Sequence, residues 1–222
     1  MKKAAFYTLG CKVNQYETEA MAELFADSGY EIKEFTEVAD VYVINTCSVT
    51  NMGDRKSRQI IRRAKKLNPN AVIAVTGCYA QTAPDEVLAI EGVNLVLGTK
   101  DRKNIVTLVE ELNTESNINH VSDIMSNHEF EELQIKQYSN RTRAFIKIQE
   151  GCNQFCSYCI IPYARGPVRS RAKDDVVREI KELAHNGFKE IILVGIHVAS
   201  YGVDLGDTTL ESLIMDVDKI DG

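Results

Sequence analysis

Three cysteines with the spacing of metal-cluster ligands stand in the segment GCNQFCSYC. They are Cys152, Cys156 and Cys159, a C-x3-C-x2-C arrangement directly after a strand expected at residues 144–149. Three thiolates are one fewer than a structural zinc site or a cluster held entirely by cysteine requires. A [4Fe–4S] cluster with three protein ligands keeps one iron open, and an open iron can chelate a small molecule. A cluster of this kind is therefore one interpretation of the three cysteines.

Two simpler interpretations of these cysteines exist. His185 or His197 could complete a zinc site, although structural zinc sites usually pair C-x2-C units. The even total of six cysteines would also suit a disulfide framework. However, the opening MKKAAFYTLGCK soon turns polar and no long apolar run follows, so we expect a cytoplasmic protein without a membrane span. In that reducing compartment, cysteines point to metal or redox chemistry rather than to disulfides.

The other three cysteines occupy equivalent places in a repeating pattern. Cys11, Cys47 and Cys78 each come just after an expected strand. In a parallel sheet the carboxyl ends of the strands converge on one edge, where ligands bind. A single buried cysteine is usually a small apolar core residue. Three occurrences at equivalent positions instead favour a second cluster, again with one open iron.

The elements that must position these cysteines alternate between strands and helices over the first hundred residues. Their apolar runs predict strands at residues 4–9, 31–35, 40–45, 71–76 and 94–97. Helices are expected before Gly29 and at residues 52–67, 84–90 and 101–112. Buried strands that alternate with helices predict an α/β fold with a doubly wound, flavodoxin-like or Rossmann-like parallel sheet over residues 1–112.

A polar segment at 113–141 is expected to be a linker, with room for a short strand or helix, to a second domain at 142–222. That domain should contain a strand at 144–149, a loop at 150–173, a helix at 174–186 and a strand at 190–195. Asp174 should cap the helix and Gly187 should end it. A last helical repeat covers 210–220. Two βα units cannot close a barrel, so we expect the chain to be part of a longer protein.

Four motifs carry a resemblance to a known family. They are LGCKVNQYETE at 9–19, INTCSVT at 44–50, TGCYAQ at 76–81 and EGCNQFCSYCIIPYARG at 150–166. Together they resemble the methylthiotransferases of the radical S-adenosylmethionine superfamily. The resemblance implies that residues 142–222 begin a radical-SAM partial TIM barrel. It also implies two [4Fe–4S] clusters, S-adenosylmethionine, an electron donor of the flavodoxin or ferredoxin type, and a carboxy-terminal RNA-binding barrel.

The resemblance also implies the chemistry. In the superfamily the open iron binds the amino and carboxylate groups of S-adenosylmethionine, and an electron from the cluster releases a 5′-deoxyadenosyl radical. Tyr158 matches the aromatic position near the adenine, and Gly195, Ile196 and His197 match a turn that contacts the methionine part. For His197, a histidine that merely packs a loop is the alternative. Methylthiotransferases convert a C–H bond to C–SCH3.

Three substrates are known among such enzymes: threonylcarbamoyladenosine in tRNA, isopentenyladenosine in tRNA, and an aspartate of a ribosomal protein. The segment VGIHVASYGVD at 194–204 and the opening KVNQYETE are most similar to the threonylcarbamoyladenosine branch. Pro167 departs from that pattern, where an arginine is expected. An iron–sulfur electron carrier or sensor is the alternative from another functional class.

Two local basic patches could bind RNA, although the net charge is −6. In the helix at 52–67, one stripe holds Arg55, Arg58, Arg62 and Lys66. A solvated helix face is the ordinary interpretation of such a charge run. The second patch lies beside the loop that bears Cys152, Cys156 and Cys159, and it comprises Arg165, Arg169, Arg171 and Lys173.

Overall fold

The computed structural model describes residues 1–222 apart from 49–50, 113–116, 134, 136–142 and 222. Six strands form one parallel sheet in the order β2-β1-β3-β4-β5-β6. The strands are β1 (Lys3–Thr8), β2 (Glu31–Lys33), β3 (Val41–Thr46), β4 (Val72–Gly77), β5 (Leu95–Leu97) and β6 (Ile118–His120). The helices among them are α1 (Lys12–Asp27), α2 (Asn51–Leu67), α3 (Cys78–Thr82), α4 (Pro84–Leu88), η1 (Arg102–Asn104) and α5 (Ile105–Glu110).

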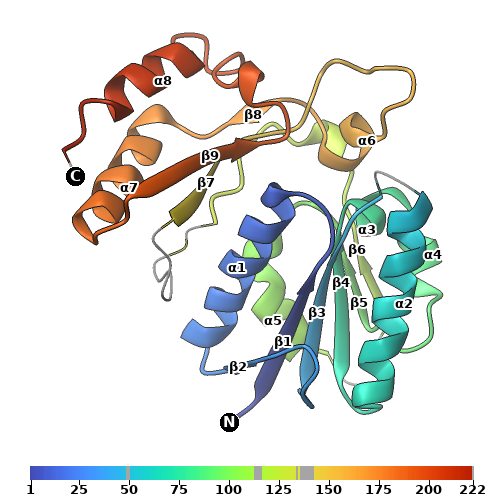
Figure 1. The fold of residues 1–222 in the computed structure, drawn as a ribbon. Coiled ribbons are helices and arrows are strands. Elements are labelled where there is room, and N and C mark those ends of the chain that lie inside the picture. The colour runs from blue at the N-terminus through green and yellow to red at the C-terminus, as the bar shows by residue number, and fades with distance from the viewer. Residues whose placement is uncertain (49–50, 113–116, 134, 136–142, 222) are drawn as a thin grey trace.

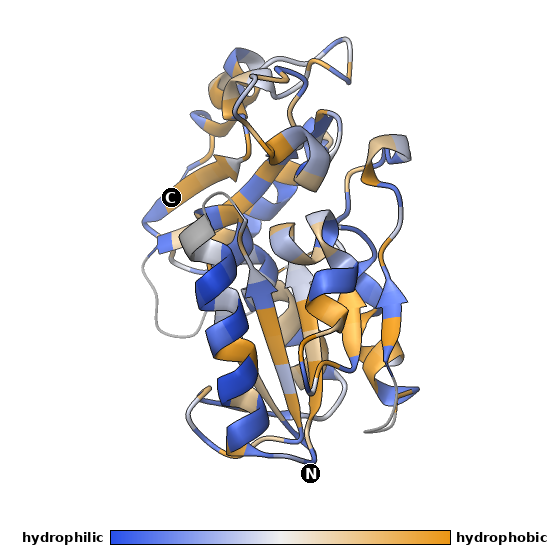
Figure 2. Cartoon of the chain, turned by 90° about the vertical axis from the view of Figure 1, so that its right-hand side faces the viewer, coloured by the Kyte–Doolittle hydropathy of each residue, from blue (hydrophilic) through white to orange (hydrophobic). Residues whose placement is uncertain are grey.

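Helices cover both faces of this sheet. Along β3, Tyr42 and Ile44 point into one apolar layer and Val41 and Val43 into the other. Helices α2 and α4 close the first layer, while α1 and α5 close the second (Figure 1). Figure 2 shows hydrophilic α2 lying over hydrophobic strands. Strands that are buried on both faces are mostly apolar, so runs of apolar residues in the sequence indicate where they lie. The prediction of an α/β fold with a doubly wound parallel sheet is confirmed.

A second sheet has the order β8-β7-β9. Strands β7 (Arg143–Glu150) and β9 (Glu190–Gly195) run parallel, and the two-residue β8 (Arg169–Ser170) pairs antiparallel with β7. Its helical segments are α6 (Ile161–Arg165), α7 (Lys173–His185), η3 (Val198–Ser200) and α8 (Leu210–Val217). Helices α7 and α8 pack on one face of the sheet.

Helix α1 lies between the two sheets. Its outer side contributes Val13, Tyr16 and Ala20 to an apolar cluster with Phe145 of β7 and Val194 of β9. Its other side packs Met21 and Phe25 against the first sheet. The amino-terminal helix therefore joins the two halves of the chain, and side chains in its middle are removed from water on both sides.

Several elements differ from the sequence expectations. The linker contains the short strand that was allowed for in it, β6, but this strand pairs with β5, so the first sheet extends past residue 112. Part of that linker (113–116, 134 and 136–141) lies outside the described residues. The expected loop at 150–173 contains α6 and β8. Asp174 as a helix cap is wrong: α7 begins at Lys173 after Ala172, and Asp174 lies in the first turn, where its charge suits the helix dipole. Gly187, with φ of 88°, follows the helix as expected.

Within the described part of the chain, none of the helices has the length and apolar character needed to span a membrane.

Candidate functional site

The first three cysteines meet at the carboxyl edge of the first sheet. Cys11 precedes α1, Cys47 follows β3, and Cys78 is the first residue of α3, directly after β4. Strands β1, β3 and β4 are neighbours, so the three residues lie side by side. A Cβ added at Gly10 would lie 2.9 Å from Cys47 Cβ and 3.2 Å from Cys47 Sγ. Glycine at this position therefore allows the Cys11 turn to approach the Cys47 side chain closely.

Asparagine side chains hold this edge together. Asn14 Nδ2 donates to the carbonyl oxygens of Leu9 at 2.9 Å and Thr46 at 3.0 Å, and Asn45 Nδ2 donates to the Asn14 carbonyl at 3.0 Å. The Cys11 thiol donates to Asn14 Oδ1 at 3.4 Å. These bonds connect the turn after β1 to the end of β3, and so fix two of the three cysteine-bearing segments relative to each other.

The second cysteine triplet lies in a loop that is closed at its base, named here the radical loop (residues 151–168). At the base, Glu150 pairs with Arg169 between β7 and β8, and the Cys152 amide donates to the Gly166 carbonyl at 3.0 Å. A Cβ at Gly151, where φ is 76°, would lie 1.8 Å from a backbone oxygen across the loop. Only glycine therefore permits this closure.

The three thiols of the radical loop are accessible. Cys156 is exposed, Cys152 and Cys159 are half-buried, and the Cys159 amide donates to the Cys156 carbonyl at 2.9 Å. The structure thus presents three thiols on one short, anchored segment, as a cluster with an open iron requires.

The end of the radical loop packs onto the first cysteine edge. Helix α6 contacts α3, and Thr99 Oγ1 donates to the Ala164 carbonyl at 2.7 Å. Arg165, at the end of α6, donates through Nε to Cys78 Sγ at 3.2 Å and through Nη2 to Asn14 Oδ1 at 2.6 Å. The two cysteine triplets, far apart in sequence, therefore lie on adjoining segments.

The donor set fits iron–sulfur chemistry. All six cysteines are free thiols. Among the described residues, no three His, Cys, Asp or Glu side chains converge where a single metal ion could sit, so the zinc alternative with His185 or His197 has no geometric support. A cubane cluster binds each thiolate through a different iron, and its ligands stand apart. Two sets of three thiols suit two such clusters.

A buried network of charges lies where α1, η1, β7 and α6 meet. Glu17 Oε1 contacts Arg102 Nη1 at 2.6 Å, Arg165 Nη1 at 2.6 Å and Lys147 Nζ at 3.2 Å. Glu150 contacts Lys147 at 2.9 Å and Arg165 at 2.7 Å. All five side chains are at most 1% exposed. Burial removes these charges from water, so their stability depends on this mutual pairing.

The expectation that Arg165, Arg169 and Arg171 form a surface patch is wrong. Their side chains are at most 2% exposed. Arg165 belongs to the charge network, Arg169 donates to backbone carbonyls including that of Arg165 at 3.0 Å, and Arg171 pairs with Glu179. These arginines bind buried carboxylates and backbone carbonyl oxygens of the protein. They are therefore not available to RNA phosphates.

The network changes the ionisation of Glu17. Burial alone would raise the pKa of this carboxyl, but Arg102, Arg165 and Lys147 outweigh it and lower the pKa to about 2. The same balance of burial against Lys147 and Arg102 holds the pKa of Glu150 well below its ordinary value. Both groups are therefore carboxylates at neutral pH.

We expect acid to weaken the fold through Glu17. The pKa of Glu17 is lower in the folded chain than in the unfolded chain, so the ionised carboxyl stabilises the fold. This stabilisation is complete above the ordinary pKa of 4.5 and is lost as the pH falls towards 2. The shift corresponds to a loss on the order of 3 kcal/mol. Urea unfolding at about pH 6 and about pH 3 should show roughly 2 kcal/mol of this loss, because the folded-state carboxyl is still mostly ionised at the lower pH. The Glu17→Gln variant should be less stable at the higher pH and should depend less on acid; an unchanged acid dependence would contradict this assignment.

The residues expected to contact S-adenosylmethionine lie at two places. Tyr158 is 90% exposed in the radical loop. Gly195, Ile196 and His197 follow one another at the carboxyl end of β9. The His197 backbone amide donates to Gln149 Oε1 at 2.7 Å, and the imidazole Nδ1 of His197 lies 2.5 Å from Ser200 Oγ. The end of β9 thus lies beside the end of β7, where the radical loop begins, and His197 already has local hydrogen-bond partners.

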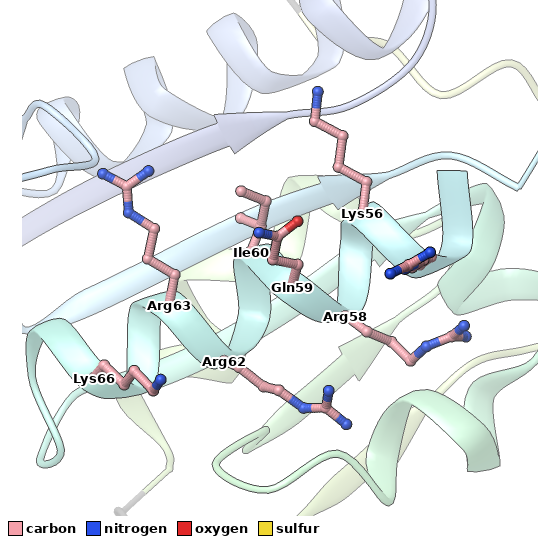
Figure 3. A pocket seen from close by; sticks show the side chains of 8 residues that line it. Lys56, Arg58, Gln59, Ile60, Arg62, Arg63 and Lys66 are labelled. Atoms are coloured by element: carbon pink, nitrogen blue, oxygen red, sulfur yellow. The ribbon is translucent and has the colours of Figure 1, made fainter. Parts of the chain in front are cut away.

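The cations of α2 form an exposed surface along one open hollow of about 680 Å³. Figure 3 shows Arg58 and Arg62 extending to one side of the helix and Lys56 and Arg63 to the other. The α2 surface, as we define it, comprises Arg55, Lys56, Arg58, Arg62, Arg63 and Lys66. All are exposed except half-buried Arg58, which donates to Tyr79 Oη at 2.8 Å and to Glu86 at 2.9 Å. Arg58 is therefore the least available of the predicted RNA contacts.

Sequence reasoning missed the buried polar residues of the site. Glu17 stands on the apolar side of α1, one turn from Val13 and from Met21, and Lys147 interrupts the buried strand AFIKIQ. A charged residue at an apolar position of a helix or strand is the signal that could have identified both, because such a charge needs a buried partner.

Two family descriptions match the chain. Residues 3–98 match the uncharacterized protein family UPF0004, and residues 146–217 match the Radical SAM superfamily. The second match implies a [4Fe–4S] cluster and S-adenosylmethionine, for which Cys152, Cys156 and Cys159 supply a fitting donor set.

Named relatives cover the whole chain. The threonylcarbamoyladenosine tRNA methylthiotransferase MtaB of Bacillus subtilis (strain 168) is 52% identical over 100% of this chain and 50% of its own length. The enzyme of the same name from Aquifex aeolicus (strain VF5) is 43% identical over 99% of this chain and 54% of its own. A tRNA-2-methylthio-N(6)-dimethylallyladenosine synthase of Dictyoglomus thermophilum is 35% identical over 99% of this chain and 51% of its own.

The chain spans about half the length of these curated relatives. The family matches occupy both halves of the chain, and each includes one of the cysteine triplets. This chain therefore belongs to the radical S-adenosylmethionine methylthiotransferase family.

Proposed function

We propose that the protein containing this chain is a tRNA methylthiotransferase that modifies threonylcarbamoyladenosine next to the anticodon. It would insert a methylthio group at carbon 2 of the adenine and use S-adenosylmethionine as both radical source and methyl donor. The two relatives named MtaB support this substrate. The observation that carries the proposal is the contact of Arg165, from the radical loop, with Cys78 of the other triplet at 3.2 Å, because the reaction needs radical and sulfur chemistry close together.

We propose that the radical loop holds the first cluster through Cys152, Cys156 and Cys159. When bound, this cluster and S-adenosylmethionine supply the radical that activates the substrate C–H bond. Tyr158 would lie against the adenine, and Gly195, Ile196 and His197 against the methionine part. The parallel pairing of β7 with β9 supports this placement, because it keeps the turn after β9 next to the loop that bears the cysteines.

A second [4Fe–4S] cluster on Cys11, Cys47 and Cys78 would take part in sulfur insertion. Support comes from the adjacency of the three strand ends and from the buried hydrogen bonds of Asn14 and Asn45 that fix their turns. In this account residues 1–112 with β6 bear the second cluster, and residues 142–222 bear the radical cluster and begin a partial barrel. A flavodoxin or ferredoxin would donate the electrons, and the tRNA substrate places the reaction in the cytoplasm.

The α2 surface would contact tRNA phosphates. Exposed arginines and lysines in a row attract a polyanion without reading its sequence. Here Arg55, Arg62 and Lys66 keep the role predicted from the sequence, with Arg63 and Lys56 added beside them. Arg165, Arg169 and Arg171 have no part in this contact.

We expect Arg62→Glu combined with Arg63→Glu to weaken tRNA binding by the full-length protein. Each lost phosphate contact should reduce the slope of log affinity against log salt by about 1. Filter binding across a salt series measures this slope. Lys181→Glu with Lys189→Glu is the matched control, since both lysines are exposed in the other half of the chain. Equal slopes in the two double variants would exclude the α2 surface as an RNA contact.

The substrate is tested by nucleoside mass spectrometry of tRNA from a strain that lacks the gene. The proposal predicts loss of methylthio-threonylcarbamoyladenosine and accumulation of its unmodified precursor. Loss of the methylthio group from isopentenyladenosine instead would move the protein to the branch of the Dictyoglomus thermophilum relative. Unchanged tRNA would leave the ribosomal aspartate or a non-catalytic iron–sulfur role as the remaining assignments.

A further inference from the structure

One buried guanidinium reaches from the radical loop to the other cysteine edge. Arg165 is completely buried, and each of its nitrogens has a partner. Nε donates to Cys78 Sγ at 3.2 Å, Nη1 contacts Glu17 at 2.6 Å and Glu150 at 2.7 Å, and Nη2 donates to Asn14 Oδ1 at 2.6 Å. Because all three nitrogens of the guanidinium have partners, the group is fixed in orientation. Its Nε–H bond therefore stays directed at Cys78 Sγ.

The charged side chains around this guanidinium carry one more positive charge than negative. Among the described residues, the cations are Arg102, Lys147, Arg165 and Arg169, and the carboxylates within 4 Å of them are Glu17, Glu131 and Glu150. Four cations stand against three carboxylates, and all seven side chains are at most 8% exposed. Buried charge requires a nearby counter-charge. A cluster-bound thiolate at Cys78, which touches Arg165, would supply it.

The partners of Arg165 also join separate parts of the chain. Glu17 and Asn14 come from α1, Cys78 follows β4, and Glu150 ends β7 immediately before the radical loop. Arg165 itself comes from the same loop as Cys159. A change in the position of Arg165 would therefore alter the surroundings of both cysteine triplets.

We propose that Arg165 is a positioning residue for the cluster on Cys11, Cys47 and Cys78: its hydrogen bond to the Cys78 sulfur raises the reduction potential of that cluster. A hydrogen bond and a positive charge at a ligand sulfur stabilise the reduced cluster, which carries one more negative charge. The same residue connects the radical loop to the segment that bears Cys78. The inference depends on the second cluster of the proposed function.

The test measures a potential, not turnover. In a Cys152→Ala, Cys156→Ala, Cys159→Ala background only the second cluster remains, and anaerobic redox titration followed by electron paramagnetic resonance gives its potential. Arg165→Gln should shift the reduction equilibrium about tenfold towards the oxidised cluster, equivalent to about 59 mV for one electron. Arg102→Gln is the control, because it removes the same charge from the same buried network and Arg102 has no hydrogen bond to a cysteine in the described structure.

The outcomes separate the possibilities. A lower potential in Arg165→Gln than in Arg102→Gln supports the proposal, and equal potentials in the two variants overturn it. If Arg165→Gln does not fold, Arg165→Lys decides: it keeps the charge without the guanidinium donor, so a lowered potential supports the proposal and an unchanged one overturns it. If the triple cysteine variant holds no iron, the second cluster itself fails, and the inference fails with it.

Discussion

Replacing Cys152, Cys156 and Cys159 by alanine is expected to abolish the reductive cleavage of S-adenosylmethionine. Their thiols stand on one anchored loop and are the accessible donors next to the turn after β9. Without them no open iron can chelate the methionine part. Production of 5′-deoxyadenosine by the reconstituted full-length protein with dithionite, measured by chromatography, should fall to the level of the protein-free control.

The matched control is the alanine replacement of Cys11, Cys47 and Cys78. This variant should still cleave S-adenosylmethionine but should not insert the methylthio group, because the proposed sulfur chemistry needs the second cluster. Cleavage that survives loss of the radical-loop cysteines would contradict the assignment. So would cleavage that depends equally on both triplets with both variants fully folded.

The largest effect on stability is expected from Glu150→Gln. Glu150 is completely buried by its neighbours and contacts Lys147, Arg102 and Arg165. The substitution keeps the shape of the side chain but removes one of the two carboxylates that these three cations share, leaving Glu17 as the other. Removing one partner of a buried charge pair costs about 3–5 kcal/mol. Chemical denaturation of the chain, followed by circular dichroism, gives the change in the free energy of unfolding.

Glu190→Gln provides the comparison, since Glu190 pairs with Arg143 at 2.7 Å and both side chains are about half exposed. Such a surface pair contributes roughly 0–1 kcal/mol. Similar losses for the two glutamates would show that the buried network does not hold α1, β7 and α6 together.

The sequence was sufficient for five of the six strands of the first sheet and for the position of Cys11, Cys47 and Cys78 just after strands. Strand β3 is buried at all six positions and begins with four apolar residues, Val41 to Ile44. Cys47 follows at the carboxyl end of this strand. Strand β6 had no such signal, because Ile118–His120 is exposed and only three residues long. Helix α3 is also short, with five residues, and it packs against α6, which comes much later in the chain.

The buried charge network could not be predicted from the pattern of neighbouring residues in the sequence. Arg165 lies 148 residues from Glu17 and 87 from Cys78 along the chain. A cluster of arginines after the radical motif has the composition of a nucleic-acid patch, and only the fold shows that carboxylates of α1 and β7 surround it. Glu17 and Lys147 were visible as charges at apolar positions, but their partners depend on how α1 fits between the two sheets.

The central claim is that the two cysteine triplets hold two separate [4Fe–4S] clusters on adjoining segments. Iron and sulfide analysis with Mössbauer spectroscopy of the anaerobically reconstituted protein tests it most directly. The account predicts that alanine replacement of either triplet removes half of the iron and leaves one intact [4Fe–4S] cluster. Full iron content after replacement of Cys11, Cys47 and Cys78, or loss of all iron after replacement of either triplet alone in a folded protein, would contradict it.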